Sequence, residues 1–117
     1  MIINTLMKNW KWQERYLDLA EEISKWSKDP STQCGAVAVG DKGQILSQGY
    51  NGFLPGCPHE SHVVNGHEIA TIHAEQNAIC DCAKRGTSCE NSTAYITHYP
   101  CIICARLLIC LLYTSPS

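Results

Sequence analysis

Long apolar runs are missing from this sequence, and that absence argues against a membrane protein. No stretch approaches the roughly 20 consecutive apolar residues that a helix needs to span a bilayer. The opening stretch, MIINTLMKNWKW, has neither a continuous apolar segment nor a small-residue cleavage site, so it does not read as a signal peptide. We therefore expect a cytoplasmic protein with no membrane partner.

The sequence also has little net charge and no internal repeat or low-complexity segment. A formal net charge of −2 gives no reason to expect a nucleic-acid partner. The length of 117 residues, with 44% hydrophobic and 17% charged residues, is typical of one globular domain.

Cysteine, in contrast, is abundant, with eight residues in the chain. Such a count is typical either of a secreted disulfide scaffold or of a cytosolic metal protein. The lack of a signal peptide and the histidines near the cysteines favour the metal protein. Cys80 and Cys82 fall within a predicted helix and can instead be small buried hydrophobic residues.

Hydrophobic periodicity predicts three helices and three main strands. The first helix has an apolar face of Tyr16, Leu17, Ala20 and Ile23, with Trp12 and Trp26 as further candidates. The order is that of an α/β domain whose helices cover a mixed sheet, with a strand–helix–strand crossover that implies parallel pairing of its two strands. The predicted elements are a helix at 10–27, a strand hairpin at 33–39 and 44–51, a long loop at 51–70, a helix at 72–85 ended by Gly86, a strand at 93–99 and a helix from Pro100.

Two short motifs, HAE at 73–75 and PCIIC at 100–104, supply the side chains of a metal site. Alone, a Cys-x-x-Cys pair can be redox-active, metal-binding or incidental. Together, His73, Cys101 and Cys104 form a zinc-type ligand set, which leaves a fourth position open for water. Glu75 is poorly placed as a fourth ligand but can reach such a water as a general acid–base.

These motifs and their surroundings resemble deoxycytidylate (dCMP) deaminases of the cytidine deaminase superfamily. The resemblance covers residues 10–109, and it is carried by SKDPSTQCGAV, GYNGFLPG, NGH, HAEQNAI and AYITHYPCIICAR. It implies a deaminase-like fold of α-β-α layers, a zinc cofactor and hydrolysis of dCMP to dUMP and ammonia. It also implies an oligomer regulated by dCTP and dTTP.

The resemblance further implies roles for individual residues. His73, Cys101 and Cys104 would bind zinc, and Glu75 would carry protons to the cytosine ring and the departing ammonia. Asn51 would contact the deoxyribose, with a simple turn residue as the alternative. The backbone at Ala74 would line the base pocket.

The predicted loop at 51–70 holds further ligand types, Cys57, His59, His62 and His67. Some family members carry a second, structural zinc, and this loop is a candidate for one. Because the family places those ligands differently, the residues do not transfer one by one. The alternative is a solvated loop that covers the substrate.

Three other functions remain open on the sequence alone. A tRNA adenosine deaminase shares the zinc motif but needs a basic surface. A structural zinc module would have no use for Glu75 beside an open metal position. A disulfide protein would pair its cysteines.

The chain is expected to divide at residue 109. Residues 1–109 form a deaminase domain that lacks the C-terminal strands and helix of its family. Residues 110–117, CLLYTSPS, resemble the translation of a sequencing-library adapter. The alternative is a genuine short C-terminus whose Leu111, Leu112 and Tyr113 pack on the sheet edge.

Overall fold

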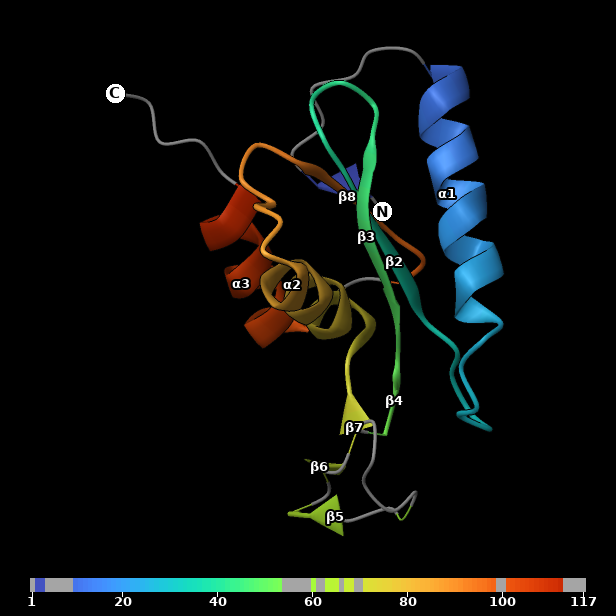
Figure 1. Ribbon diagram of the computed structural model, residues 1–117. Helices are drawn as coiled ribbons and strands as arrows, with labels where there is room; N and C mark the ends of the chain where they lie inside the picture. The colour runs from blue at the N-terminus through green and yellow to red at the C-terminus, as the bar shows by residue number, and fades with distance from the viewer. Residues whose placement is uncertain are drawn as a thin grey trace.

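The computed structural model describes residues 2–3, 10–53, 60, 63–65, 67–68, 71–98 and 101–112. A central sheet has one helix on one face and two helices on the other (Figure 1). The three helices are α1 (Trp10–Ser24), α2 (Ala74–Arg85) and α3 (Ile102–Leu112). This arrangement confirms an α/β domain whose helices cover a sheet.

The central sheet has four strands in the order β1-β8-β2-β3, and every described pairing in it is antiparallel. The hairpin of β2 and β3 confirms the predicted one. Strand β1 was not predicted, and it pairs with the edge of β8. The strands are β1 (Ile2–Ile3), β2 (Gly35–Val39), β3 (Ile45–Tyr50) and β8 (Thr93–Ile96).

The parallel pair implied by the crossover through the 72–85 helix is wrong, and so is a mixed sheet among the described strands. Strand β8 pairs with β2, so β2 lies between β8 and β3. Strands β8 and β3 are both antiparallel to β2 and therefore run in the same direction as each other. The crossover through α2 thus joins two strands of equal direction that are not neighbours.

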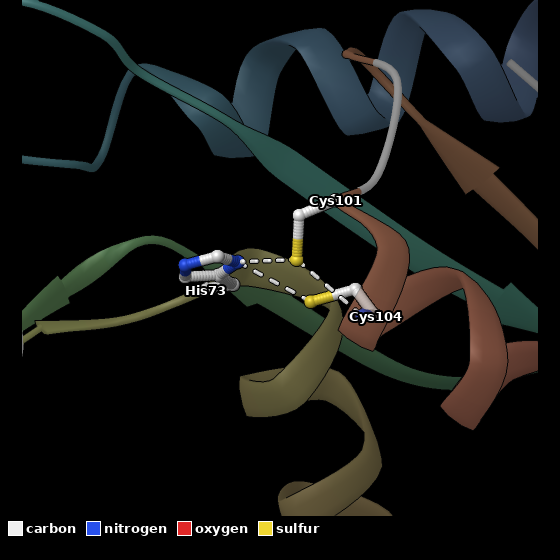
Figure 2. A group of neighbouring side chains, drawn as sticks. All are labelled: His73, Cys101 and Cys104. Carbon is white, nitrogen blue, oxygen red and sulfur yellow. Dashed lines mark hydrogen bonds between the residues drawn. The ribbon is translucent and has the colours of Figure 1, made fainter. Parts of the chain in front are cut away.

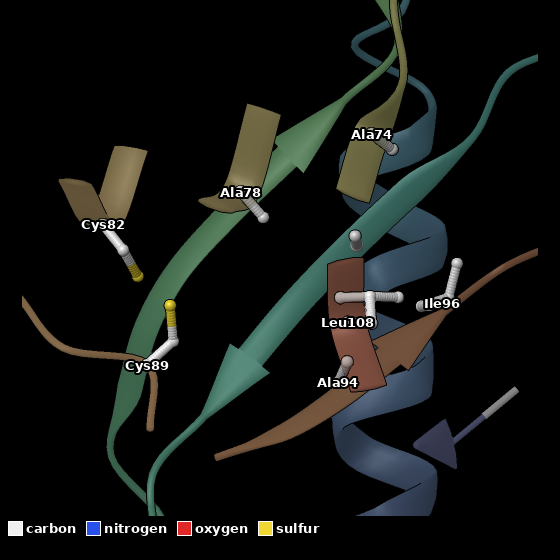
Figure 3. Packing of buried hydrophobic residues seen from close by; sticks show 8 residues of the cluster. Ala74, Ala78, Cys82, Cys89, Ala94, Ile96 and Leu108 are labelled. Carbon is white, nitrogen blue, oxygen red and sulfur yellow. The ribbon is translucent and has the colours of Figure 1, made fainter. Parts of the chain in front are cut away.

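Strands β2 and β8 are buried on both faces, and the two-residue period of a strand sends their alternate side chains to opposite faces. On β2, Ala36 faces α2, whereas Val37 and Val39 face α1. On β8, Ile96 and Tyr95 divide in the same way. Figure 3 shows the cluster between the sheet and the helices α2 and α3.

Helix α1 buries the face that its sequence predicts, through Tyr16, Ala20 and Ile23. The two tryptophans are less buried than expected, with exposed fractions of 44% for Trp12 and 55% for Trp26. The helix ends at Ser24, so Trp26 lies beyond it and does not share its face.

The predicted loop at 51–70 contains short strands instead of being irregular throughout. One pair joins β4 (Gly52–Phe53) to β7 (Thr71–Ile72), and a second joins β5 (Val63–Val64) to β6 (His67–Glu68). The first pair connects the end of β3 to the segment just before α2. It therefore ties the chain immediately before the metal-ligand candidate His73 to the segment that follows β3.

Helix α2 begins and ends close to the predicted residues. Gly86 follows it with a left-handed φ of 66°, a conformation that favours glycine, and ends the helix as predicted. Strand β3 passes close to α2 at Gly49. A Cβ there would lie 2.5 Å from the carbonyl oxygen of Ala74 and 2.6 Å from the backbone nitrogen of Ala78.

Helix α3 begins at Ile102, just after Cys101, and continues through Cys110 to Leu112. Pro100, expected to open this helix, lies outside the described residues, as do residues 113–117. The foreign origin of residues 110–117 stays a prediction. A search of the described helices finds none long and apolar enough to cross a bilayer.

Candidate metal centre

His73, Cys101 and Cys104 come together at the starts of two helices (Figure 2). His73 is the residue before α2, and its backbone N–H donates to Oε1 of Gln76 at 3.0 Å. Cys101 precedes α3, and its sulfur accepts the backbone N–H of Cys104 at 3.4 Å. Helix starts carry partial positive charge, which favours thiolate ligands.

The distances within this group fit a tetrahedral zinc ion. Nδ1 of His73 lies 3.2 Å from Sγ of Cys104 and 3.6 Å from Sγ of Cys101. Zinc bonds of about 2.0–2.1 Å to nitrogen and about 2.3 Å to sulfur would hold such atoms about 3.6 Å apart at tetrahedral angles. The three ligand atoms lie within 4.8 Å of one another, so the donor set is compact enough to share one ion.

Glu75 lies against this group rather than in it. Only 5% of the residue is exposed, on the first turn of α2. Burial raises the pKa of the Cys104 thiol well above its usual range, and hydrogen bonds with Cys101 and Glu75 add to the effect. The Glu75 side chain therefore lies next to the thiol of Cys104.

A cleft of about 360 Å³ opens onto the same group. Its lining includes His73, Glu75 and Cys101, together with the predicted substrate residues Asn51 and Ala74. This volume falls in the range of small-molecule sites. The structure thus brings the predicted metal, acid–base and substrate residues to a single cleft.

The side chain of Asn51 makes two hydrogen bonds to the backbone that its sequence motif did not predict. Its Oδ1 accepts the backbone N–H of Cys34 at 2.8 Å, and its Nδ2 donates to the carbonyl of Thr32 at 2.9 Å. The side chain therefore holds the segment before β2 against the end of β3. It shapes the cleft wall by these bonds.

Sequence reasoning assigned no role to four polar residues of the cleft, Asp29, Thr32, Thr71 and His98. Asp29 accepts the backbone N–H groups of Ser31 and Thr32 at Oδ1, and these bonds lower its pKa below the ordinary value. The available signals were their positions and, for Asp29, Thr32 and His98, their place within the motifs SKDPSTQCGAV and AYITHYPCIICAR. Asp29 precedes the first predicted strand, and His98 lies three residues before Cys101.

The candidate second zinc site lies almost entirely outside the described residues. Cys57, His59 and His62 are outside them, and for His67 only the backbone, in β6, is described. The second site stays a prediction. The seven cysteines within the described residues are all free, so no disulfide supports the scaffold alternative there.

Comparison with known proteins agrees with the metal centre. Residues 10–113 match the family model described as cytidine and deoxycytidylate deaminase zinc-binding region. An uncharacterized deaminase in the luxG 3′ region of Aliivibrio fischeri is 42% identical over 102 residues, which cover 85% of this chain and 66% of that protein. A probable deoxycytidylate deaminase of Caenorhabditis elegans is 41% identical over 106 residues, which cover 85% of this chain and 52% of that protein.

Among solved structures, the dCMP deaminase of cyanophage S-TIM5 in complex with dCMP and dUMP is similar, with a TM-score of 0.80 and 30% identity. The match covers 90% of this chain and 78% of that one. The chain spans between about half and two thirds of the curated relatives named above. On the match over residues 10–113, the chain belongs to the cytidine and deoxycytidylate deaminase family.

Proposed function

We propose that the protein is a zinc-dependent enzyme that hydrolyses dCMP to dUMP and ammonia. The observation that carries the proposal is the buried Glu75 beside the group of His73, Cys101 and Cys104. The likeness to a deaminase structure with bound dCMP and dUMP supports the choice of substrate. Cytosine deamination consumes one water and releases one ammonia, so the site needs a proton carrier but no redox partner.

Each residue has a defined part in this proposal. His73, Cys101 and Cys104 would hold zinc, which when bound supplies the Lewis acidity that makes water nucleophilic near neutral pH. Two thiolates offset the charge of the ion. Glu75 accepts the proton of the attacking water at its carboxylate and delivers protons to N3 of the ring and to the departing amine.

The test is ammonia release from dCMP, dCTP, cytidine and tRNA by the zinc-loaded protein. We expect activity on dCMP. Replacing Glu75 by Gln or Ala should lower kcat by about 10²–10⁴-fold, because general acid–base catalysis contributes about that factor. Zinc content should stay at the wild-type level, since Glu75 is not one of the three proposed ligands.

Glu22→Ala is the matched control, because Glu22 is an exposed carboxylate on α1 that pairs only with the nearby Lys25. It should leave the ammonia release unchanged. A zinc-loaded wild type that releases no ammonia from dCMP would contradict the proposal. Undiminished activity in the Glu75 variants would contradict the role of Glu75.

We also propose where the enzyme acts, how it assembles and which nucleotides regulate it. We infer a cytoplasmic homo-oligomer that supplies dUMP for dTMP synthesis and responds to dCTP and dTTP. Exposed apolar side chains on α3 support self-association, Ile102 and Ile103 being 66% and 60% exposed. Activity measured with and without the two triphosphates, on protein of known mass in solution, tests this part.

A further inference from the structure

The cleft at the metal centre contains three nitrogen-bearing side chains in its described lining: Asn51, His73 and His98. His73 belongs to the proposed metal group. Both polar atoms of the Asn51 amide are bonded to the backbone of the neighbouring segment. His98 is exposed, lies outside the metal group and has its described contact with Thr97. It is therefore the nitrogen donor of the cleft that remains available to a ligand.

Thr97 contacts the imidazole ring of His98 at Nδ1. Its Oγ1 accepts the backbone N–H of Gly35 at 3.0 Å and lies 2.8 Å from Nδ1 of His98. The hydroxyl has one proton and a second lone pair besides the one that Gly35 uses, so Oγ1 can donate to Nδ1 or accept an N–H from it. A neutral imidazole that accepts at Nδ1 carries its hydrogen on Nε2.

The position of Thr97 is itself held by the sheet. Its backbone N–H donates to the carbonyl of Gly35 at 3.1 Å, so both its main chain and its side chain are bonded to the start of β2. The Thr97–His98 pair thus sits on a rigid strand end. Rigid support of this kind is what a residue that positions a ligand requires.

The charges of the cleft indicate which kind of ligand group such a donor meets. Asp29 and Glu75 are carboxylates, and the pKa of Asp29 is held low by backbone N–H groups. They accept hydrogen bonds and do not suit the carbonyl or phosphate oxygens of a pyrimidine nucleotide. An Nε2–H group is complementary to such oxygens.

We propose that His98 positions the substrate by donating a hydrogen bond from Nε2 to an oxygen of the pyrimidine nucleotide, and that Thr97 sets the tautomer which makes this possible. The inference rests on the proposed dCMP deaminase activity and adds a specificity-determining pair to it. Neither residue contributes to the metal group.

The test compares His98→Ala with wild type in the zinc-loaded protein, on both dCMP and deoxycytidine. We expect kcat/KM for dCMP to fall about 5- to 100-fold, the range of one lost hydrogen bond to a neutral or charged acceptor. Zinc content should be unchanged. A fall of similar size on both substrates places the contact at the base or sugar, and a fall on dCMP alone places it at the phosphate.

Thr97→Ser and Thr97→Val form a matched pair for the tautomer. Serine keeps the hydroxyl and should retain a KM close to wild type. Valine removes it and should raise KM in the same direction as His98→Ala. Valine also leaves the Gly35 N–H without its side-chain acceptor, so the melting temperature is recorded to separate loss of fold from loss of binding.

Unchanged kcat/KM in His98→Ala on both substrates would overturn the inference while leaving the deaminase proposal intact. If the wild type proves inactive on dCMP, calorimetric titration of dCMP and dUMP into zinc-loaded wild type and His98→Ala decides instead. Binding at least 5-fold weaker in the variant supports the role of His98. Equal affinity, or no binding to the wild type, overturns it.

Discussion

Cys104 is a proposed metal ligand whose thiol would have to lose its proton when a metal binds. It is fully buried, and burial, together with hydrogen bonds with Cys101 and Glu75, raises its pKa above the usual range for a thiol. At neutral pH the metal-free thiol is therefore protonated. A zinc ion must displace that proton, because the thiolate is the ligand form.

Zinc binding should consequently release protons and strengthen as pH rises. The raised pKa means that the protonated form dominates across pH 6–8, so apparent affinity should increase about tenfold per pH unit for each thiol that loses a proton. Competition with a chromophoric chelator at pH 6, 7 and 8 measures this slope. Cys104→Ser should abolish tight binding, and an affinity independent of pH in the wild type would contradict the assignment.

Asn51 shows where residue-level prediction from sequence stops. The motif around it indicates a ligand contact, and the structure does place it in the cleft. Its hydrogen-bond partners, however, are backbone groups 17 and 19 positions away along the chain. Pairings of this kind depend on how the hairpin and the preceding segment pack, so spacing within a motif does not predict them.

At the scale of elements, Gly49 controls how closely β3 approaches the start of α2. An added Cβ would meet backbone atoms of Ala74 and Ala78 at distances that real Cβ atoms do not adopt. Gly49→Ala should therefore push α2 away and displace His73, which immediately precedes that helix. We expect the free energy of unfolding to fall by about 1–3 kcal/mol, the usual cost of overpacking, and zinc affinity to fall with it.

Gly52→Ala is the matched control, because a Cβ at Gly52 meets no atom of the described residues within 4 Å. It should change neither the urea midpoint nor the zinc affinity appreciably. Equal behaviour of the two variants in urea unfolding and chelator competition would show that the close approach at Gly49 has no role in holding the metal centre.

Elements with strong local signals were predicted well. The helix at 72–85 has a small apolar face and a glycine stop, and α2 with Gly86 follows that prediction. The strands β4 to β7 were missed because two-residue strands are too short to show a two-residue period. The neighbour of β8 was predicted wrongly because strand pairing is non-local, and β2 occupies the place expected for β3.

At the scale of the whole molecule, α3 has more exposed large hydrophobic side chains than any other described element. It buries Cys104 and Leu108 but leaves several large side chains in contact with solvent. Exposed apolar patches of this kind mark association sites or aggregation liabilities. The exposed side chains are Ile102, Ile103, Leu107 and Ile109.

We expect the 117-residue chain to self-associate at micromolar concentration through this surface. Ile103→Lys combined with Ile109→Lys should shift it toward the monomer, because charged side chains oppose burial of the patch. Light scattering coupled to size exclusion measures the mass. Glu14→Gln combined with Glu21→Gln shifts the net charge by the same amount on exposed residues of α1, on the opposite face of the sheet (Figure 1), and should leave the mass unchanged. A wild type that is monomeric at these concentrations would contradict the expectation.

The spacing of the three proposed metal ligands along the chain would have a consequence for the lifetime of the protein in a cell. Cys101 and Cys104 lie 28 and 31 residues beyond His73 along the chain, so a bound ion fastens two helix starts together as a reversible cross-link. Each tenfold rise in free zinc above the dissociation constant then adds about 1.4 kcal/mol to folding. Chains made during zinc starvation would open more often and be degraded sooner. Zinc supply would thus set how much of the protein persists, as well as how much of it is active.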